Sequence, residues 1–149
     1  MATTISRLDT RELRAWRGLL RVHAQLSKAL DAQLLAEHGL PLTSYEVLMY
    51  LSDSDGGRMR MNELAASVLL SRSGLTRLVD RLEREGYLER CSCAHDARGA
   101  FAVLTQAGRE KVDAARITHL AGVREHFLSN FSSDELDVLG EAWDRVLSR

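Results

Sequence analysis

Basic and hydroxyl side chains share one face of a helix that the sequence predicts from Ser71 to Gly86. The apolar residues of this segment, Leu75, Leu78, Val79 and Leu82, recur at intervals of three and four and would pack against the rest of the protein. At about 100° per residue, the opposite half carries Arg72, Ser73, Thr76, Arg77, Asp80, Arg81 and Arg84. Guanidinium and hydroxyl groups presented in this way suit the base edges and phosphates of the DNA major groove, although a solvated helix face is the simpler alternative.

A short helix is predicted directly before this one, and the pair has the length of a helix-turn-helix. It runs through Leu64, Ala65 and Val68, and small Ala65 lets the two helices approach closely. Ser71 is expected to cap the second helix, which leaves backbone N–H groups available to a phosphate.

A β-hairpin is predicted immediately after the second helix, in the position of a wing. Residues 87–91 and 100–104 alternate between apolar and polar, and the polar segment 92–99 separates them. Arg98 at the tip could enter the narrow minor groove, where the potential is most negative, and Asp96 could hold its guanidinium in place. A surface ion pair of little energetic value is the alternative.

Charge is distributed unevenly along the 149 residues, although the net charge is only −1. Residues 58–104 carry eight arginines against six acidic residues, a balance of +2, whereas the segments before and after are −1 and −2. With 45% hydrophobic and 28% charged residues the composition is that of an ordinary globular protein. No signal peptide and no apolar run of about 20 residues is seen, so we expect a cytoplasmic protein that does not cross a membrane.

A long first helix is predicted from Thr10 to His38, begun by a capping box of Asp9 and Glu12. At ~1.5 Å per residue it would be roughly 40 Å long, too long for a small helical core to cover. Part of its apolar face should therefore meet another chain.

The remaining helices are placed by their start signals. Pro41 breaks the first helix, and Thr43 with Glu46 is predicted to be the capping box of the second. Thr105 should cap the helix after the hairpin, and Ser132 with Glu135 should open the last one. The fold class is mainly α with a small β-hairpin wing, in the order four helices, two strands, two helices. We divide it into a first helix (1–38), a winged domain (41–104) and C-terminal helices (105–149).

Several of these segments together resemble the MarR family of winged helix-turn-helix regulators. The motifs are Asn62-Glu63-Leu64-Ala65, residues 71–90, Asp96-Ala97-Arg98, Val103-Leu104-Thr105 and Gly108. The resemblance implies a homodimer in which the first and the last two helices pair and two winged domains bind a pseudo-palindromic DNA site. It also implies repression and release by a small-molecule or redox signal. One departure is that Arg60 or Met61 stands where family members often have a capping Ser or Thr.

Roles for single residues follow from this reading. Ser71, Arg72, Ser73, Thr76 and Arg77 are expected at base edges and phosphates, and Ser44, Arg60, Arg81 and Arg84 at the DNA backbone. By resemblance, an effector pocket lies between the dimerisation helices and the winged domain. Its candidate lining residues are Trp16, His23, Tyr45 and Met49, although such side chains are more often part of a core.

The two cysteines, Cys91 and Cys93, lie two apart on a predicted strand and so on the same face, with His95 nearby. A redox or metal-sensing regulator is therefore an alternative function, but no fourth metal ligand is in view, and we predict neither a metal site nor a cofactor.

No nucleophile elbow, Gly-rich phosphate loop or His-Glu-x-x-His motif suggests an enzyme. A winged-helix module that binds proteins instead of DNA is the other alternative, and it would have no reason to keep arginines on the groove-facing side.

Overall fold

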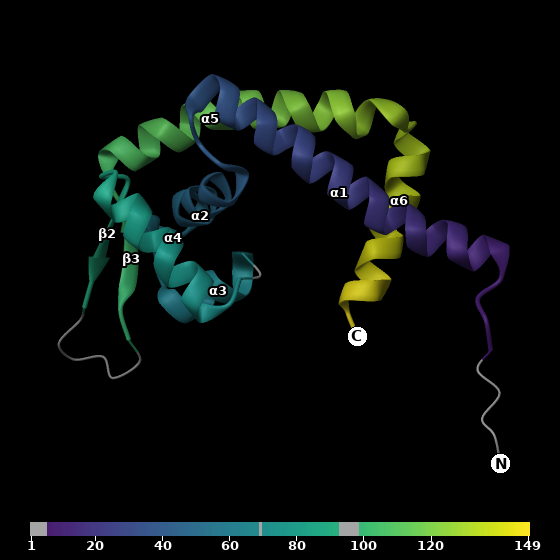
Figure 1. Ribbon diagram of the computed structural model, residues 1–149, viewed down its shortest axis with the longest axis horizontal. Coiled ribbons are helices and arrows are strands. Elements are labelled where there is room, and N and C mark those ends of the chain that lie inside the picture. The colour runs from purple at the N-terminus through teal and green to yellow at the C-terminus, as the bar shows by residue number, and fades with distance from the viewer. Residues whose placement is uncertain (1–5, 69, 93–98) are drawn as a thin grey trace, which may run out of the picture.

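A computed structural model describes residues 6–68, 70–92 and 99–149. Within these ranges the α-helices are α1 (Thr10–His38), α2 (Leu42–Asp53), α3 (Met61–Val68), α4 (Arg72–Arg84), α5 (Gln106–His126) and α6 (Ser133–Leu147). The strands are β1 (Arg58–Arg60), β2 (Leu88–Cys91) and β3 (Phe101–Leu104), and two short 3-10 turns, η1 (Asp55–Gly57) and η2 (Leu128–Asn130), join elements. The long helices α1 and α5 run across the molecule, with α2, α3, α4 and the sheet at one end and α6 folded down at the other (Figure 1).

The sheet has three antiparallel strands in the order β1-β3-β2, whereas the sequence predicted only the two strands of the hairpin. Arg58 lies opposite Val103 and Arg60 opposite Phe101, while Leu88 on the other side lies opposite Leu104. The strand β1 was missed because its three residues, Arg-Met-Arg, are too few to show a period of two.

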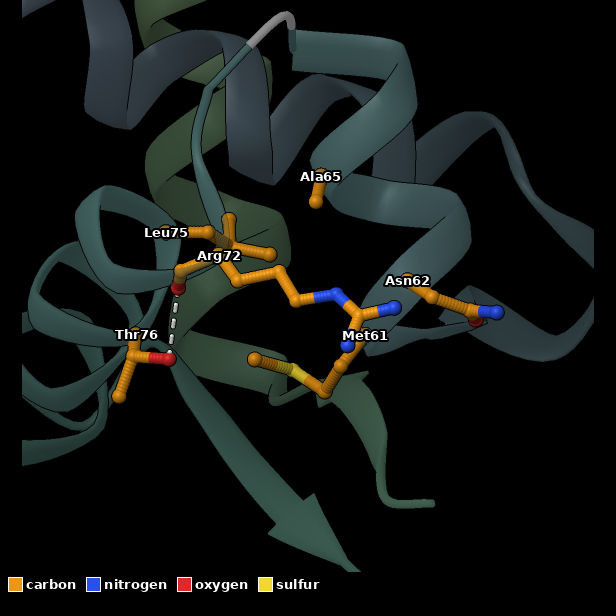
Figure 2. A pocket seen from close by; sticks show the side chains of 6 residues that line it. All are labelled: Met61, Asn62, Ala65, Arg72, Leu75 and Thr76. Atoms are coloured by element: carbon orange, nitrogen blue, oxygen red, sulfur yellow. Dashed lines mark hydrogen bonds between the residues drawn. The ribbon is translucent and has the colours of Figure 1, made fainter. Parts of the chain in front are cut away.

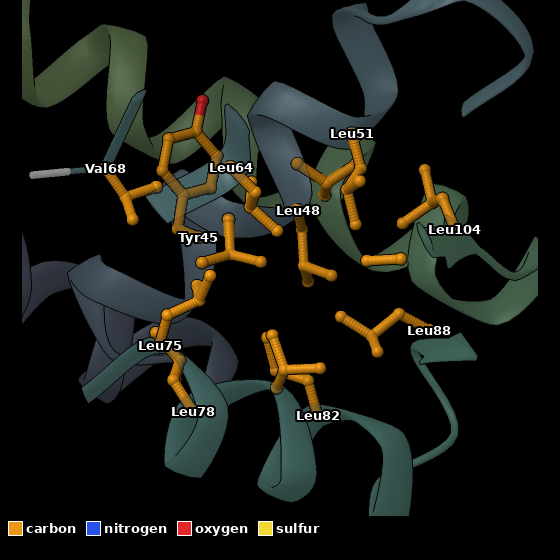
Figure 3. Packing of buried hydrophobic residues seen from close by; sticks show 14 of the residues in the cluster. Tyr45, Leu48, Leu51, Leu64, Val68, Leu75, Leu78, Leu82, Leu88 and Leu104 are labelled. Atoms are coloured by element: carbon orange, nitrogen blue, oxygen red, sulfur yellow. The ribbon is translucent and has the colours of Figure 1, made fainter. Parts of the chain in front are cut away.

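The core of the winged domain is built from the apolar faces of its helices and closed by the sheet (Figure 3). The predicted stripe of α4 is confirmed, since Leu75, Leu78, Val79 and Leu82 are all buried. They pack with side chains from α2, α3, the strands and α5, among them Tyr45, Leu48, Leu51, Leu64, Val68, Leu88, Leu104 and Val112. Burying one face of α4 in this way leaves its other face to solvent.

Most of the predicted helix starts are confirmed by their hydrogen bonds. Asp9 and Glu12 exchange two side-chain-to-backbone bonds of 2.8 Å at the start of α1, and Ser132 and Glu135 form the same capping box at α6. Thr105 Oγ1 accepts the N–H of Gly108 at 3.0 Å.

The capping box predicted for α2 is wrong. The helix begins at Leu42 after Pro41, and Thr43 lies inside it. The Leu42 N–H donates instead to Asp31 Oδ1 of α1 at 2.8 Å, so the cap comes from a different helix. This bond ties the winged domain to the long helix α1.

A close approach of two backbones explains Gly108. A Cβ on this residue would lie 2.0 Å from the Tyr87 carbonyl oxygen and 2.7 Å from Leu104 Cδ1. The same Tyr87 oxygen accepts the N–H of Thr105 at 3.1 Å, and Thr105 Oγ1 donates to the Gly86 carbonyl at 2.7 Å. The start of α5 is therefore clamped to the turn between α4 and β2.

The far end of the molecule keeps much apolar surface exposed. No residue of α6 is buried, and Val138, Val146 and Leu147 are 64%, 64% and 81% exposed. Trp16 and Leu20 on α1 are also exposed. An apolar groove of about 630 Å³ runs between α1 and α6 and is lined by Leu19, Val22, Phe127, Phe131, Leu139 and Trp143 among others. No helix in the described ranges is long and apolar enough to cross a membrane.

Candidate nucleic-acid interface

The exposed face of α4 carries most of the predicted contact residues. Ser71, Arg72, Ser73, Thr76, Arg77, Arg81 and Arg84 are all exposed. Ser71 Oγ caps the helix by accepting the N–H of Gly74 at 3.1 Å and lies 3.2 Å from Ser73 Oγ. Thr76 Oγ1 donates to the Arg72 carbonyl at 2.8 Å, so its oxygen remains available as an acceptor.

A cleft of about 250 Å³ lies between the N-terminal parts of α3 and α4. Arg72 extends from α4 across this cleft toward Met61 and Asn62 at the start of α3 (Figure 2). Asn62 is exposed, and its Oδ1 accepts the N–H of Glu63 at 3.0 Å. The structure thus places Asn62 beside Arg72, although the sequence had suggested it only as part of the motif.

Ser44 does not lie on the surface as predicted. It is 1% exposed, and its Oγ accepts a hydrogen bond from Arg81 Nη2 at 2.8 Å. A hydroxyl this deeply buried does not reach a phosphate, so its expected role in contacting DNA is corrected. Ser44 instead orients Arg81, which lines a hollow of about 270 Å³ between α2 and α4 together with Thr43 and Arg77.

Arg90 on β2 links the hairpin to α4. Its Nη1 forms an ion pair with Asp80 Oδ1 at 2.5 Å, and its Nη2 donates to the Thr76 carbonyl at 3.2 Å. Its backbone N–H donates to Glu83 Oε2 at 2.7 Å. These bonds fix the hairpin against the exposed helix face. Sequence reasoning missed this residue, and the one signal was an acidic residue, Asp80, among the arginines of α4.

The other predicted residues of the hairpin are only partly described. Asp96, Arg98 and Cys93 lie outside the described residues. Cys91 is exposed at the end of β2, opposite Phe101. Arg60 is half-buried, with its guanidinium carbon 4.7 Å from the centroid of the Phe101 ring. Among the described residues, no group of three His, Cys, Asp or Glu side chains is arranged to hold a metal ion.

The four predicted effector residues do not line one cavity within the described chain. Trp16 and His23 are exposed on α1, and Met49 is half-buried on α2 against the core. Tyr45 is 1% exposed and is part of the core. Burial raises the pKa of the Glu46 carboxyl, and the nearby His23 partly opposes this rise.

A polar cluster occupies the boundary between α2 and α5. Arg116 Nη2 donates to Asp53 Oδ1 at 2.9 Å, and its positive charge also acts on the nearby Tyr45 hydroxyl. The rings of Tyr45 and His119 are 4.5 Å apart. Burial raises the pKa of Tyr45, which Arg116 opposes, and lowers the pKa of His119. The imidazole is therefore held in its neutral form more strongly than in water.

Known proteins share this architecture. The model of the MarR family matches residues 38–99. The crystal structure of AbsC, a MarR family transcriptional regulator from Streptomyces coelicolor, superposes with a TM-score of 0.89 and 36% identity over 96% of both chains.

Two further proteins are similar over most of the chain. Sco3205, a MarR family transcriptional regulator from Streptomyces coelicolor solved in complex with DNA, has a TM-score of 0.88 and 33% identity, covering 95% of this chain and 92% of its own. YkoM of Bacillus subtilis (strain 168), an uncharacterized HTH-type transcriptional regulator, is 31% identical over 125 residues, 82% of this chain and 79% of its own. All three similarities cover more of the chain than the family model does.

Proposed function

Because the chain belongs to the MarR family of transcriptional regulators, we propose that it is a homodimeric repressor that binds a pseudo-palindromic operator and is released by a small molecule. Its place in this family makes it a DNA-binding transcription regulator and not an enzyme. The operator, the dimer and the effector are the parts that we propose.

The observation that carries the proposal is the two-sided character of α4. One face is anchored by four buried aliphatic residues, and the other presents arginines and hydroxyls to solvent. A rigidly held helix of this kind fits the major groove, which is wide enough to admit it. Arg72, Ser73, Thr76 and Arg77 contact base edges, with Ser71 at a phosphate.

The DNA backbone is contacted around this helix. Arg81, oriented by Ser44, and Arg84 bind phosphates, and Arg60 does so at the start of α3. Arg98, oriented by Asp96, enters the minor groove. Arg90 fixes β2 to α4, so the base of the hairpin keeps a set position beside this helix.

Support for the dimer comes from the exposed apolar faces of α1 and α6. A groove of this size and apolar lining is costly to leave in water. A second copy of the chain, presenting the same surface, would cover it. The two winged domains would then lie apart on one face of the assembly, as a site with two half-sites requires.

The effector is proposed to bind between α2, α5 and the partner's helices, near Trp16, His23 and Met49. The cluster of Tyr45, Arg116 and His119 supports this position, because it gathers polar groups in an otherwise apolar boundary. A molecule bound there would change how the winged domain is held against α1 and α5.

The first test is fluorescence anisotropy with the DNA upstream of the protein's own gene and a scrambled duplex of equal length, at two salt concentrations. A specific regulator should favour the first duplex by ~10³ or more. Arg77→Ala should cost ~1–3 kcal/mol and relax specificity, whereas Arg84→Ala should weaken both duplexes alike. Equal, weak and salt-sensitive binding to several such upstream regions would contradict the proposal and favour a protein partner.

The dimer is tested by sedimentation at micromolar concentration. The wild-type protein should be dimeric, and Trp143→Glu, which places a charge in the apolar groove, should be monomeric. Arg84→Ala is the matched control, because it lies on α4 and should remain dimeric. A monomeric wild-type protein would refute this part of the proposal.

A further inference from the structure

Two arginines of β1 stack on one aromatic ring on the outer face of the sheet. The guanidinium carbon of Arg58 lies 4.1 Å from the centroid of the Phe101 ring, and that of Arg60 lies 4.7 Å from it. The inner face of the sheet is the core side, since Leu88, Ala102 and Leu104 are buried there. Because side chains alternate along a strand, Arg58, Arg60 and Phe101 share the opposite face.

The side chain of Arg58 is directed along the sheet toward the tip of the hairpin. Its backbone pairs with Val103, but its guanidinium lies over the ring of Phe101, two residues nearer the tip. The stack therefore carries its charge toward the end of the sheet that leads into the wing.

Arg58 is also available to a ligand. It is exposed, and none of the ion pairs between described residues involves it. Among the described strands β1 lies at the edge of the sheet, with only β3 beside it. Stacking restricts the guanidinium without using its in-plane N–H donors, which can still bind an oxyanion in a bidentate manner.

From these contacts we propose that Arg58, held by Phe101, binds a phosphate of the DNA backbone beside the wing. The proposal rests on the operator binding proposed above. It adds a contact outside α4 and the hairpin tip, and it gives Phe101 the role of a positioning residue. A phosphate is the ligand that fits, because a rigid and unpaired guanidinium recognises a planar pair of anionic oxygens.

The test measures binding as a function of salt with the upstream duplex and with the scrambled duplex. Losing one phosphate contact lowers the slope of log K against log salt by about 0.9, or about 1.8 for the two subunits of a dimer. The same relation predicts a loss of about eightfold in affinity per contact at about 0.1 M salt for Arg58→Ala. Both duplexes should be affected, because a phosphate carries no sequence information.

Two further variants separate the charge from its positioning. Arg58→Lys should keep most of the slope and lose part of the affinity, because lysine is a point charge without a planar fork. Phe101→Leu keeps an apolar residue in β3 and keeps the charge of Arg58. It should leave the slope nearly unchanged and weaken binding about two- to tenfold, since the freed side chain must be ordered on binding.

Arg149→Ala is the matched control, because it removes one positive charge at the C-terminal end, well apart from the sheet (Figure 1). It should bind like the wild type. Suppose that the wild type prefers the upstream duplex but that Arg58→Ala has the same salt slope and affinity as Arg149→Ala. This result would overturn the phosphate contact of Arg58 and leave the proposed function standing. A wild-type protein that shows no preference for any upstream duplex would instead overturn the proposed function.

Discussion

Replacing Gly108 with alanine tests how tightly α5 is joined to the winged domain. The new Cβ would lie 2.0 Å from the Tyr87 carbonyl oxygen and 2.9 Å from the Tyr87 carbonyl carbon. Both are backbone atoms, so no side chain can rotate away, and either α5 or the turn before β2 must move. That movement would also stretch the bond from the Thr105 N–H to the Tyr87 carbonyl, now 3.1 Å.

The expected cost follows from three contributions. Forcing an extra methyl group into a packed junction costs about 1–3 kcal/mol. Weakening one backbone hydrogen bond costs up to about 1.5 kcal/mol. Alanine returns at most about 1 kcal/mol through its higher helix propensity. Taken at the middle of their ranges, these contributions lower the free energy of unfolding by about 2 kcal/mol.

The assay is urea denaturation followed by circular dichroism, at one fixed protein concentration because a dimer's stability depends on it. Ala107→Ser is the matched control: this neighbour in the first turn of α5 is exposed, so its substitution should change the free energy of unfolding by no more than about 0.5 kcal/mol. If Gly108→Ala were as stable as the wild type, the junction would yield without cost, and the reasoning about the clamp would be wrong.

Three other substitutions test the core and the polar cluster. Leu82→Ala should lower the free energy of unfolding by about 2–5 kcal/mol in the same denaturation assay, because the side chain is 0% exposed; a loss below 1 kcal/mol would contradict the packing. Tyr45→Ala should lower the free energy of unfolding by about 3–5 kcal/mol, because the ring is 1% exposed in the core, and thermal unfolding that matches the wild type would contradict this packing. Burial lowers the pKa of His119, so the unfolded chain takes up a proton at higher pH than the folded chain does. Stability measured against pH should therefore decline as pH falls below about 6.5, and His119→Gln should flatten this decline; an unchanged profile would show that another group titrates.

Long periodic segments and complete capping boxes allowed most helices to be predicted from sequence. The start of α1 at Asp9 and that of α6 at Ser132 are fixed by residues three positions apart, so their physics is local. The start of α2 is different, because its first N–H is capped by Asp31 from another helix. Thr43 and Glu46 have the right spacing, but the helix is capped at Pro41, two residues before Thr43, so they lie inside it and cannot act as its cap. Local patterns cannot report a partner supplied by tertiary structure.

The same distinction holds for the candidate interface. The exposed face of α4 follows from the spacing of its own apolar residues. The burial of Ser44 does not, because it depends on Arg81, which lies 37 residues further along the chain. Arg90 likewise becomes significant only when β2 is packed on α4 next to Asp80. The roles of Ser44 and Arg90 therefore depend on how the elements pack together and not only on the residue types.

The order of the strands also affects how the protein is made. Strand β3 lies between β1 and β2 but is the last of the three to be synthesised, since β1 ends at Arg60 and β3 ends at Leu104. At ~5–20 residues per second, roughly 2–9 seconds pass between the synthesis of β1 and that of β3, the strand it pairs with. During that interval α3 and α4 exist without β3 and without the α5 residues that complete their core, among them Leu104 and Val112. We therefore expect a nascent chain to acquire affinity for DNA only after β3 and the first half of α5 have left the ribosome.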